Sequence, residues 1–313
     1  MEQRHAPIVL ITFNRPDHTE QTLHALSLND LAKDSILYCF IDGARNADDL
    51  SKQKIISEVI RLYRGSFRKV KVVRRQVNFG LAKNIIDAVT DVVTRYGKVI
   101  VLEDDIVTSK GFLKFMNDAL EFYEREQRVW HIAANTPLNL TGRENEMFFW
   151  RGMNCWGWAT WADRWAYFEK DSQKLINDFD EKMIYDFDLD GYGSFWSQVL
   201  ANASNKIDTW AIFWYATIFI RNGLSVNPYF SFAKNIGLDG SGVHCAENKG
   251  KQSAQKLNTV GKFIGKIELV EDEFAVSLIK KSYAPNKSFR YYLLLALGFL
   301  GLKDSLKKLL GKS

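Results

Sequence analysis

The sequence predicts an α/β fold in which helices flank a mostly parallel β-sheet. Short apolar, β-branched runs recur at 8–13, 36–41, 70–73 and 99–102. Runs of this length without polar alternation are typical of strands buried on both faces of a sheet. Segments with helical spacing of apolar residues separate these runs, which favours parallel strands joined by helices. The composition, 46% hydrophobic and 25% charged with 5 prolines, is that of a folded protein.

The first strand and helix are predicted from the N-terminal thirty residues. Ile8–Phe13 is a continuous apolar run, and Pro16 then stands where the first turn of a helix tolerates proline. Leu23, Leu26 and Leu28 follow at roughly helical spacing. We therefore expect a buried strand followed at once by a helix.

The next three strands are predicted from the same alternation of an apolar run with a helical segment. A second strand is expected at Ile36–Ile41 and ends at Asp42–Gly43, and a polar helix separates it from a strand at Val70–Val73. A helix is predicted from about Gly80 to Arg95, and Val99–Leu102 makes the fourth strand. This strand–helix order predicts a Rossmann-like arrangement.

The pattern is less regular after residue 105. A helix is expected at Lys110–Glu126 and a strand at Val129–Ala134, and the polar segment Asn135–Glu146 is interpreted as a substrate-binding loop. We expect residues 1–265 to form one domain, with a nucleotide-binding half at 1–107 and an acceptor-binding half at 108–265. Residues 266–313 would form a C-terminal helical region.

The C-terminal segment combines leucines and lysines. Leu302, Leu306, Leu309 and Leu310 fall on one helical face, and lysines occupy another. A basic amphipathic helix of this kind is typical of a membrane-surface anchor. The alternative is a terminal helix packed on the domain, whose lysines the helix dipole favours.

The net charge and the cysteine content indicate which binding partners and which cellular compartment are compatible with this sequence. The net charge is +5 with a pI near 8.9, which suits an anionic membrane surface or substrate, and no Arg/Lys-rich run predicts binding to nucleic acid. Three widely spaced cysteines favour a reducing compartment. The polar N-terminus does not resemble a secretory signal, and no apolar run reaches the roughly 20 residues that span a bilayer. We expect a cytoplasmic protein, peripheral at the inner face of the plasma membrane.

Polar residues follow the predicted strands at the edge where ligands bind in such sheets. The first strand ends at Asn14–Arg15, the second at Asp42–Gly43 and the fourth at Glu103–Asp105. Three consecutive carboxylates repel one another in a crevice, and Mg²⁺ or Mn²⁺ would relieve that repulsion. Strand alternation predicts that Glu103 and Asp105 point one way and Asp104 the other. The alternative is a solvated acidic turn.

The run Val99–Val107, followed by Gly111–Phe112, resembles glycosyltransferases of the GT-A fold. It is similar to N-acetylglucosaminyltransferase I and related bacterial nucleotide-sugar transferases. Thr12–Pro16 resembles the first-strand motif of the family, Asn78–Asn84 its segment before the acidic motif, and Gly157–Trp158 with Trp165 its Gly-Trp…Trp helix. The resemblance covers about residues 8–245.

The resemblance implies a role for each matching residue. Asp105 would bind the metal, Mn²⁺ or Mg²⁺, and His244 resembles a late histidine that returns towards the diphosphate or metal. Asp104 or Glu103 would contact the ribose or order waters on the metal, and Asp42 would recognise uracil. The other implied donor contacts are Asn14, Arg15, Gly80, Lys83 and Trp158.

An inverting transferase needs a general base near the acceptor hydroxyl. Asp208 resembles the family's base, although Thr209 stands where the family has a second aspartate, and Asp163 is the second candidate. Asp208 could instead cap the following helix.

The function predicted from these motifs is transfer of a sugar from a UDP-sugar to a glycan or lipid-linked oligosaccharide acceptor, with inversion, in bacterial surface polysaccharide assembly. A nucleotidyltransferase that makes a nucleotide-sugar would share the fold, but Asn14–Pro16 lacks its Gly-rich phosphate loop. A nicotinamide enzyme is disfavoured because no Gly-x-Gly-x-x-Gly follows an early strand. A catalytically inactive sugar-nucleotide-binding module is the remaining alternative.

Overall fold

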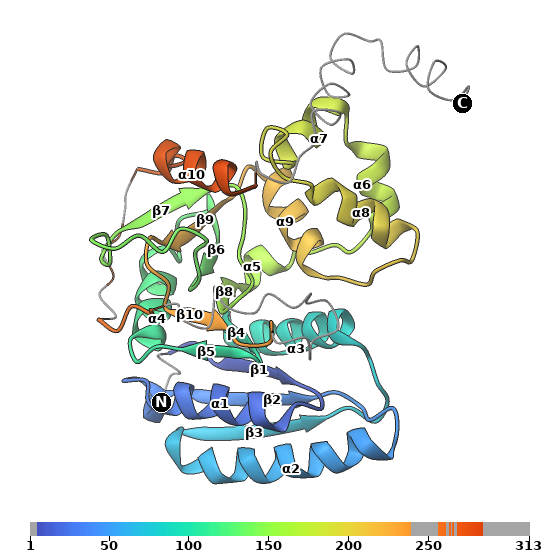
Figure 1. The fold of residues 1–313 in the computed structure, drawn as a ribbon, viewed down its shortest axis with the longest axis vertical. Helices are drawn as coiled ribbons and strands as arrows, with labels where there is room; N and C mark the ends of the chain where they lie inside the picture. Colours follow the sequence, from blue (N-terminus) through green and yellow to red (C-terminus); the bar gives the residue numbers. More distant parts are fainter. Residues whose placement is uncertain (1–4, 239–255, 261–262, 264, 266–267, 284–313) are drawn as a thin grey trace. The chain divides into compact units, whose positions relative to one another are not determined.

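The computed structural model describes residues 5–238, 256–260, 263, 265 and 268–283. It confirms the predicted α/β class: helices flank a mostly parallel sheet of eight strands (Figure 1). The strands are β1 (Ile8–Thr12), β2 (Ile36–Ile41), β3 (Lys69–Arg74), β4 (Lys98–Glu103), β6 (Val129–Ala133), β7 (Met147–Trp150), β8 (Trp158–Trp161) and β9 (Leu224–Pro228). Their order in the sheet is β3-β2-β1-β4-β8-β6-β9-β7.

Two hydrophobic clusters cover the two faces of this sheet. Strand β1 shows why, because Ile8 and Leu10 belong to one cluster and Val9 and Ile11 to the other. The first cluster includes side chains of α1 (Pro16–Ser27), α2 (Ala47–Tyr63) and α4 (Phe112–Phe122), and the second includes side chains of α3 (Leu81–Tyr96), α5 (Ala162–Trp165) and α9 (Ala211–Ile220). Burial on both faces explains the continuous apolar runs in the sequence.

Strand β8 interrupts the parallel order. It lies between β4 and β6 and is antiparallel to both, and β7 is antiparallel to β9. The tryptophan-rich stretch therefore contributes a central strand, and Trp158 and Trp161 on this strand are buried. The sequence pattern did not predict β7, β8 or β9.

A small antiparallel ribbon, β5 (Ile106–Thr108) with β10 (Ala233–Asn235), begins directly after the acidic motif. The amide of Ile236 donates a hydrogen bond of 2.9 Å to the carbonyl of Asp105. This ribbon fixes residues 236–238 against the end of β4, although the two segments are far apart in the sequence.

The chain divides into two compact units. The first comprises 1–169 and 209–272, and the second comprises 170–208 and 273–313. The described part of the second unit contains α6 (Ser172–Asp178), α7 (Glu181–Phe187), α8 (Phe195–Ala203) and α10 (Glu273–Tyr283). This division differs from the expected boundary at residue 265, because a segment from the middle of the chain joins the second unit.

Inside the second unit, the helices are joined by aromatic packing and by local hydrogen bonds. Phe179 stacks on Trp196 with ring centroids 5.1 Å apart, and Asp180 accepts a hydrogen bond from the amide of Met183 at the start of α7. Asp188 accepts a hydrogen bond of 2.8 Å from the amide of Trp196. These contacts explain why an acidic sequence piece forms an ordered helical unit.

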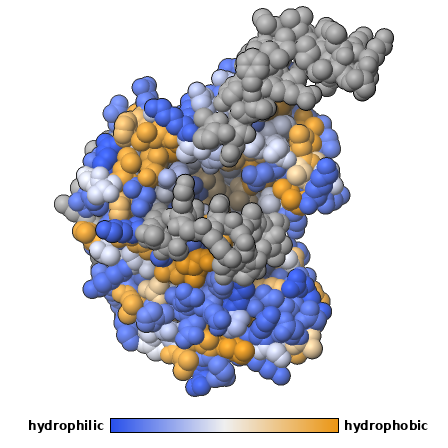
Figure 2. Space-filling view, viewed as in Figure 1, coloured by the Kyte–Doolittle hydropathy of each residue, from blue (hydrophilic) through white to orange (hydrophobic). Residues whose placement is uncertain are grey.

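No helix in the described residues is long and apolar enough to cross a membrane. The predicted amphipathic segment at 289–312 lies outside the described residues. On the face shown in Figure 2, hydrophobic residues form separate small groups among hydrophilic ones.

Candidate active site

The C-terminal ends of β1, β2 and β4 meet at one edge of the sheet. Thr12 pairs with Ile41, and Ile11 pairs with Glu103. This register brings Arg15, Asp42 and the acidic motif to the same edge. Because β1 lies between β2 and β4, the ends of these two strands are about 10 Å apart, or two strand spacings.

The acidic motif does not follow strand alternation. Strand β4 ends at Glu103, and Asp104 and Asp105 form a turn. Nη2 of Arg15 donates to the carboxylates of both Asp104 and Asp105, with 2.9 Å between Nη2 and Oδ2 of Asp105. The expectation that the two aspartates point in opposite directions is therefore corrected: in a turn, consecutive side chains can converge on one partner.

Burial and like charge make this motif costly. Burial raises the pKa of Asp104 to about 6, in spite of the opposing effect of Arg15. Burial, with the charges of Asp105 and Asp104, also raises the pKa of Glu103 well above its ordinary value. Three carboxylates carry more negative charge than one guanidinium neutralises, so the motif favours an additional cation.

Helix α1 positions both members of the Arg15–Asp104 pair. The amide and the hydroxyl of Thr19 donate to the carbonyl of Arg15 at 3.0 and 2.8 Å. The hydroxyl of Thr22 donates to the carbonyl of Asp104 at 2.8 Å. The main chains of the two residues are thus fixed to one helix, which begins at Pro16.

Gly237 packs against Asp105 and Arg15. A Cβ built at Gly237 would overlap Oδ2 of Asp105 and lie 2.9 Å from Nη1 of Arg15. The main chain can approach the ion pair this closely because the residue is glycine. The amide of Gly237 is held by a hydrogen bond of 2.7 Å to Oδ1 of Asn235.

The residues present fit a divalent cation at Asp105. Its Oδ1 is buried and has no hydrogen-bond donor in the part of the chain that the structure describes. A carboxylate oxygen in this state is a suitable ligand for Mg²⁺ or Mn²⁺. The described residues contain no cluster of three His, Cys, Asp or Glu side chains that could hold a metal. The second predicted ligand, His244, lies outside the described residues.

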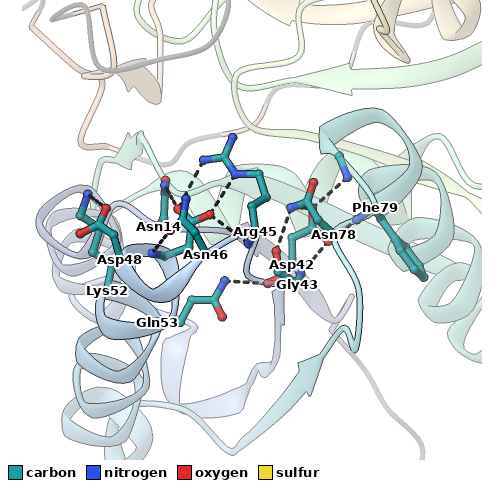
Figure 3. A network of polar contacts seen from close by, with 12 residues as sticks. Asn14, Asp42, Gly43, Arg45, Asn46, Asp48, Lys52, Gln53, Asn78 and Phe79 are labelled. Atoms are coloured by element: carbon teal, nitrogen blue, oxygen red, sulfur yellow. Dashed lines mark hydrogen bonds and ion pairs between the residues drawn. The ribbon is translucent and has the colours of Figure 1, made fainter.

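Asp42 has a different environment from the acidic motif. Its Oδ1 accepts hydrogen bonds from the amides of Gly43 and Phe79, at 2.9 and 2.8 Å. Its Oδ2 accepts from Nδ2 of Asn78 and from the amide of Gly80, both at 3.0 Å. Figure 3 shows Asp42 with Gly43, Asn78 and Phe79 around it. The four acceptor positions of the carboxylate are therefore used within the chain.

The predicted donor residues Gly80 and Lys83 lie beside Asp42 at the start of α3. Gly80 has φ of +74°, a left-handed conformation that favours glycine. Nζ of Lys83 lies 4.2 Å from the ring centroid of Phe79. Gly43 also needs to be glycine, because a Cβ there would lie 2.5 Å from the amide nitrogen of Asn78. Asp42 thus fixes the loop that carries these residues.

Asn14 takes part in a network that the motif search missed. Its Nδ2 donates to Oδ1 of Asp49 at 2.6 Å, and Oδ2 of Asp49 accepts from Nε of Arg45 at 2.9 Å (Figure 3 labels Asn14 and Arg45). The hydrogen bond from Arg45 lowers the pKa of Asp49 to about 2. Asn46 caps α2 by accepting from the amide of Asp49. The spacing Asn-x-x-Asp before a helix is a capping signal that could have identified this network.

Trp158, expected near a sugar, is buried in the core. It is 1% exposed and stacks on Trp210 and His131, with ring centroids 5.0 and 5.4 Å apart. The ring of Trp158 therefore packs against other rings of the core. Gly157, directly before it, has φ of +74° and provides the tight turn into β8.

The two candidate bases lie in different units of the chain. Asp163 follows β8, whose end pairs with Lys98 at the start of β4, so it lies at the opposite edge of the sheet. The length of β4 places it roughly 16 Å from the acidic motif. Asp208 belongs to the second unit, where it is exposed and paired with Lys170. The N-cap position of α9 is Trp210, and its side chain makes no capping hydrogen bond. Asp208 therefore does not occupy the cap of this helix.

No protein-family model and no curated protein matches the sequence. The structure is similar to that of TarS from S. aureus, with 16% identity and a TM-score of 0.34, over 46% of this chain and 40% of the TarS chain. It is also similar to the mannosyltransferase PcManGT from Pyrobaculum calidifontis, solved with GDP-Man and Mn²⁺, with 9% identity and a TM-score of 0.40 over 100% of this chain and 90% of that one.

A third similar structure is the galactosyltransferase LgtC with donor and acceptor sugar analogues. It shows 10% identity and a TM-score of 0.36, over 68% of this chain and 70% of that chain. All three TM-scores are below 0.5, so the similarity to these structures is weak.

Proposed function

We propose that this chain transfers a sugar from a nucleoside-diphosphate sugar, with UDP as the nucleotide, to a glycan acceptor. The observation that carries this proposal is the buried Oδ1 of Asp105, which has no hydrogen-bond donor among the described residues and lies at the C-terminal end of a central strand. Mn²⁺ or Mg²⁺ held there would stabilise the charge of a departing diphosphate. Arg15 lies beside the same carboxylate and offers a guanidinium for phosphate oxygens.

The proposed donor site extends along the sheet edge from Arg15 to the loop that Asp42 holds. Because the carboxylate of Asp42 is saturated, we propose that Asp42 acts by positioning Asn78 and Gly80 and does not contact the base itself. The choice of UDP rests on the resemblance of Asp42–Gly43 to the uracil-recognising motif, and the loop that Asp42 holds is proposed to contact the base in its place. Asp104 and Glu103 are proposed to contact the ribose or waters on the cation.

For the acceptor side, the proposal rests on the sequence. Asp208 is the proposed general base of an inverting reaction, from its sequence context, and Asp208→Asn should abolish transfer but keep UDP binding. The leucine- and lysine-rich C-terminal segment supports a lipid-linked oligosaccharide acceptor at the inner face of the plasma membrane. Sedimentation with vesicles that contain anionic lipid tests this, and an equal affinity for neutral vesicles would contradict it.

Calorimetry of UDP, GDP, CDP and dTDP, with and without Mn²⁺, tests the donor site. We expect UDP to bind only with Mn²⁺, and Asp105→Asn to reduce its affinity at least a hundredfold. Asp163→Asn is the matched control, since it removes the same charge at the opposite edge of the sheet and should leave UDP binding unchanged. If none of the nucleotides binds to the wild type, the proposed function is wrong.

The products formed from nucleotide substrates distinguish a transferase from an inactive binding module and from a nucleotidyltransferase. A transferase should slowly hydrolyse its UDP-sugar without an acceptor, whereas an inactive binding module would bind the donor and leave it intact. A nucleotidyltransferase would instead release pyrophosphate from UTP and a sugar phosphate.

A further inference from the structure

Arg15 occupies the carboxylate at which a cation would bind. Its Nη2 lies 2.9 Å from Oδ2 of Asp105 and also bonds to Asp104, while Oδ1 of Asp105 has no donor among the described residues. The carboxylates of Asp104 and Asp105 are almost completely buried. Among the described residues, the guanidinium is therefore the charge that bonds directly to both aspartates, and His18 adds a smaller electrostatic effect on Asp104.

We propose that Arg15 is an internal counter-charge, which leaves Asp105 when a divalent cation binds and then pairs with the diphosphate. The cation and the guanidinium compete for one carboxylate, and a diphosphate relieves the competition because it attracts both. Metal binding and nucleotide binding would then strengthen each other. The diphosphate part rests on the proposed function, whereas the competition between Arg15 and the cation does not.

A cation bound at Asp105 would repel the guanidinium of Arg15. A divalent cation on Asp105 would lie within a few ångströms of the guanidinium, where like charges repel strongly at the reduced dielectric of a buried site. Arginine cannot relieve this repulsion by losing its proton. Displacement of the Arg15 side chain would relieve this repulsion.

The surroundings of Arg15 allow its side chain to move while its main chain stays in place. Thr19 fixes the carbonyl of Arg15 through two hydrogen bonds. Gly237 blocks movement on one side, since even a Cβ there would lie 2.9 Å from Nη1. The side chain is nevertheless 20% exposed, more than either aspartate, so one side is open to solvent. A guanidinium that swings about a fixed Cα can exchange a carboxylate for a phosphate.

The competing interpretation is a static ion pair that only supports the turn. The two interpretations predict opposite effects of Arg15→Gln on the affinity for a cation alone. If Arg15 competes with the cation, its removal strengthens cation binding. If Arg15 only supports the turn, its removal loosens Asp105 and weakens cation binding.

The test measures Mn²⁺ binding without nucleotide, from the decrease of the electron paramagnetic resonance signal of free Mn²⁺. We expect Arg15→Gln to bind Mn²⁺ about tenfold tighter than the wild type, because a repulsive charge has been removed. Arg45→Gln is the matched control, since Arg45 is an ion-paired arginine at the same edge whose partner is Asp49. It should leave the Mn²⁺ affinity unchanged.

A second titration adds saturating UDP. In the wild type, UDP should increase the Mn²⁺ affinity about tenfold beyond the effect that it has in Arg15→Gln, since coupling between two ligands is reciprocal. Arg15→Lys keeps the charge without the planar fork and should bind Mn²⁺ alone as weakly as the wild type. If Arg15→Gln does not fold, Arg15→Met, which removes the same charge and keeps an apolar stem, should show the same increase in Mn²⁺ affinity.

Equal or weaker binding of Mn²⁺ to folded Arg15→Gln would overturn the proposal, as would equal UDP coupling in both proteins. If UDP binds to neither protein, the proposed function fails, but the comparison with Mn²⁺ alone still decides whether Arg15 is a counter-charge.

Discussion

Asp42 and Asp105 are buried aspartates two strands apart at the same edge of the sheet, yet their surroundings are opposite. Four donors from residues 43 and 78–80 saturate the carboxylate of Asp42. Asp105 has one guanidinium on Oδ2 and no donor for Oδ1 among the described residues. The position of an acidic residue after a strand therefore does not define its role. The number of donors that the chain itself provides separates a structural carboxylate from one available to a ligand.

This comparison predicts that substitution of Asp42 destabilises the protein much more than substitution of Asp105. Asp42→Ala should lower the free energy of unfolding by about 3 kcal/mol, because it leaves several buried donors without an acceptor. Asp105→Ala should change it by less than about 1 kcal/mol, because it removes one of the carboxylates that share Arg15. Urea unfolding of the two variants measures the difference. Equal destabilisation would mean that Asp105 is as structural as Asp42.

The close packing of Gly237 sharpens the comparison on the Asp105 side. Gly237→Ala should lower stability by about 1–3 kcal/mol, since the new methyl group overlaps the carboxylate of Asp105. The control is Gly65→Ala, because a Cβ at Gly65 has no heavy atom within 4 Å. Thermal unfolding should show a loss for the first variant and almost no change for the second. No loss in Gly237→Ala would show that residue 237 tolerates a side chain.

Asp49 extends the comparison to pH, with the smallest expected effect. Its pKa in the folded protein, about 2, lies below its ordinary value of 3.8, so Asp49 contributes stability above pH 4. This contribution decreases as the pH falls from about 4 to 2, when the carboxylate takes up a proton. In Asp49→Asn the unfolding midpoint should depend less on pH in that window. An unchanged slope would exclude a strong Asp49–Arg45 interaction.

The sequence predicted β1, β2 and β4 and their common edge because these strands are buried on both faces. Strand β3 lies at the end of the sheet and is largely exposed, but its valines still mark it as a strand. Continuous apolar runs such as 36–41 need no knowledge of neighbours to be identified, and the ends of parallel strands necessarily meet. The positions of Arg15, Asp42 and Asp105 at one edge follow from this pattern.

The remaining features depend on contacts that no local pattern contains. Strand β8 runs antiparallel between two parallel strands, which buries Trp158 and moves Asp163 to the opposite edge. The saturation of Asp42 depends on a loop 36 residues later in the chain. Sequence spacing therefore located the acidic residues but could not count the donors around them.

The β5–β10 ribbon has a consequence for the order in which the site is assembled. Asp105 is bound by the amide of Ile236, a residue about 130 positions later, and contacts of such long sequence separation form late in folding. A chain made from its N-terminus completes β1 to β4 long before residues 233–238 emerge. During synthesis the acidic turn would then be exposed to solvent and could bind cellular cations before residues 233–238 pack against it. Pulse-labelled hydrogen exchange during refolding should accordingly show protection of Leu102 before Ile236.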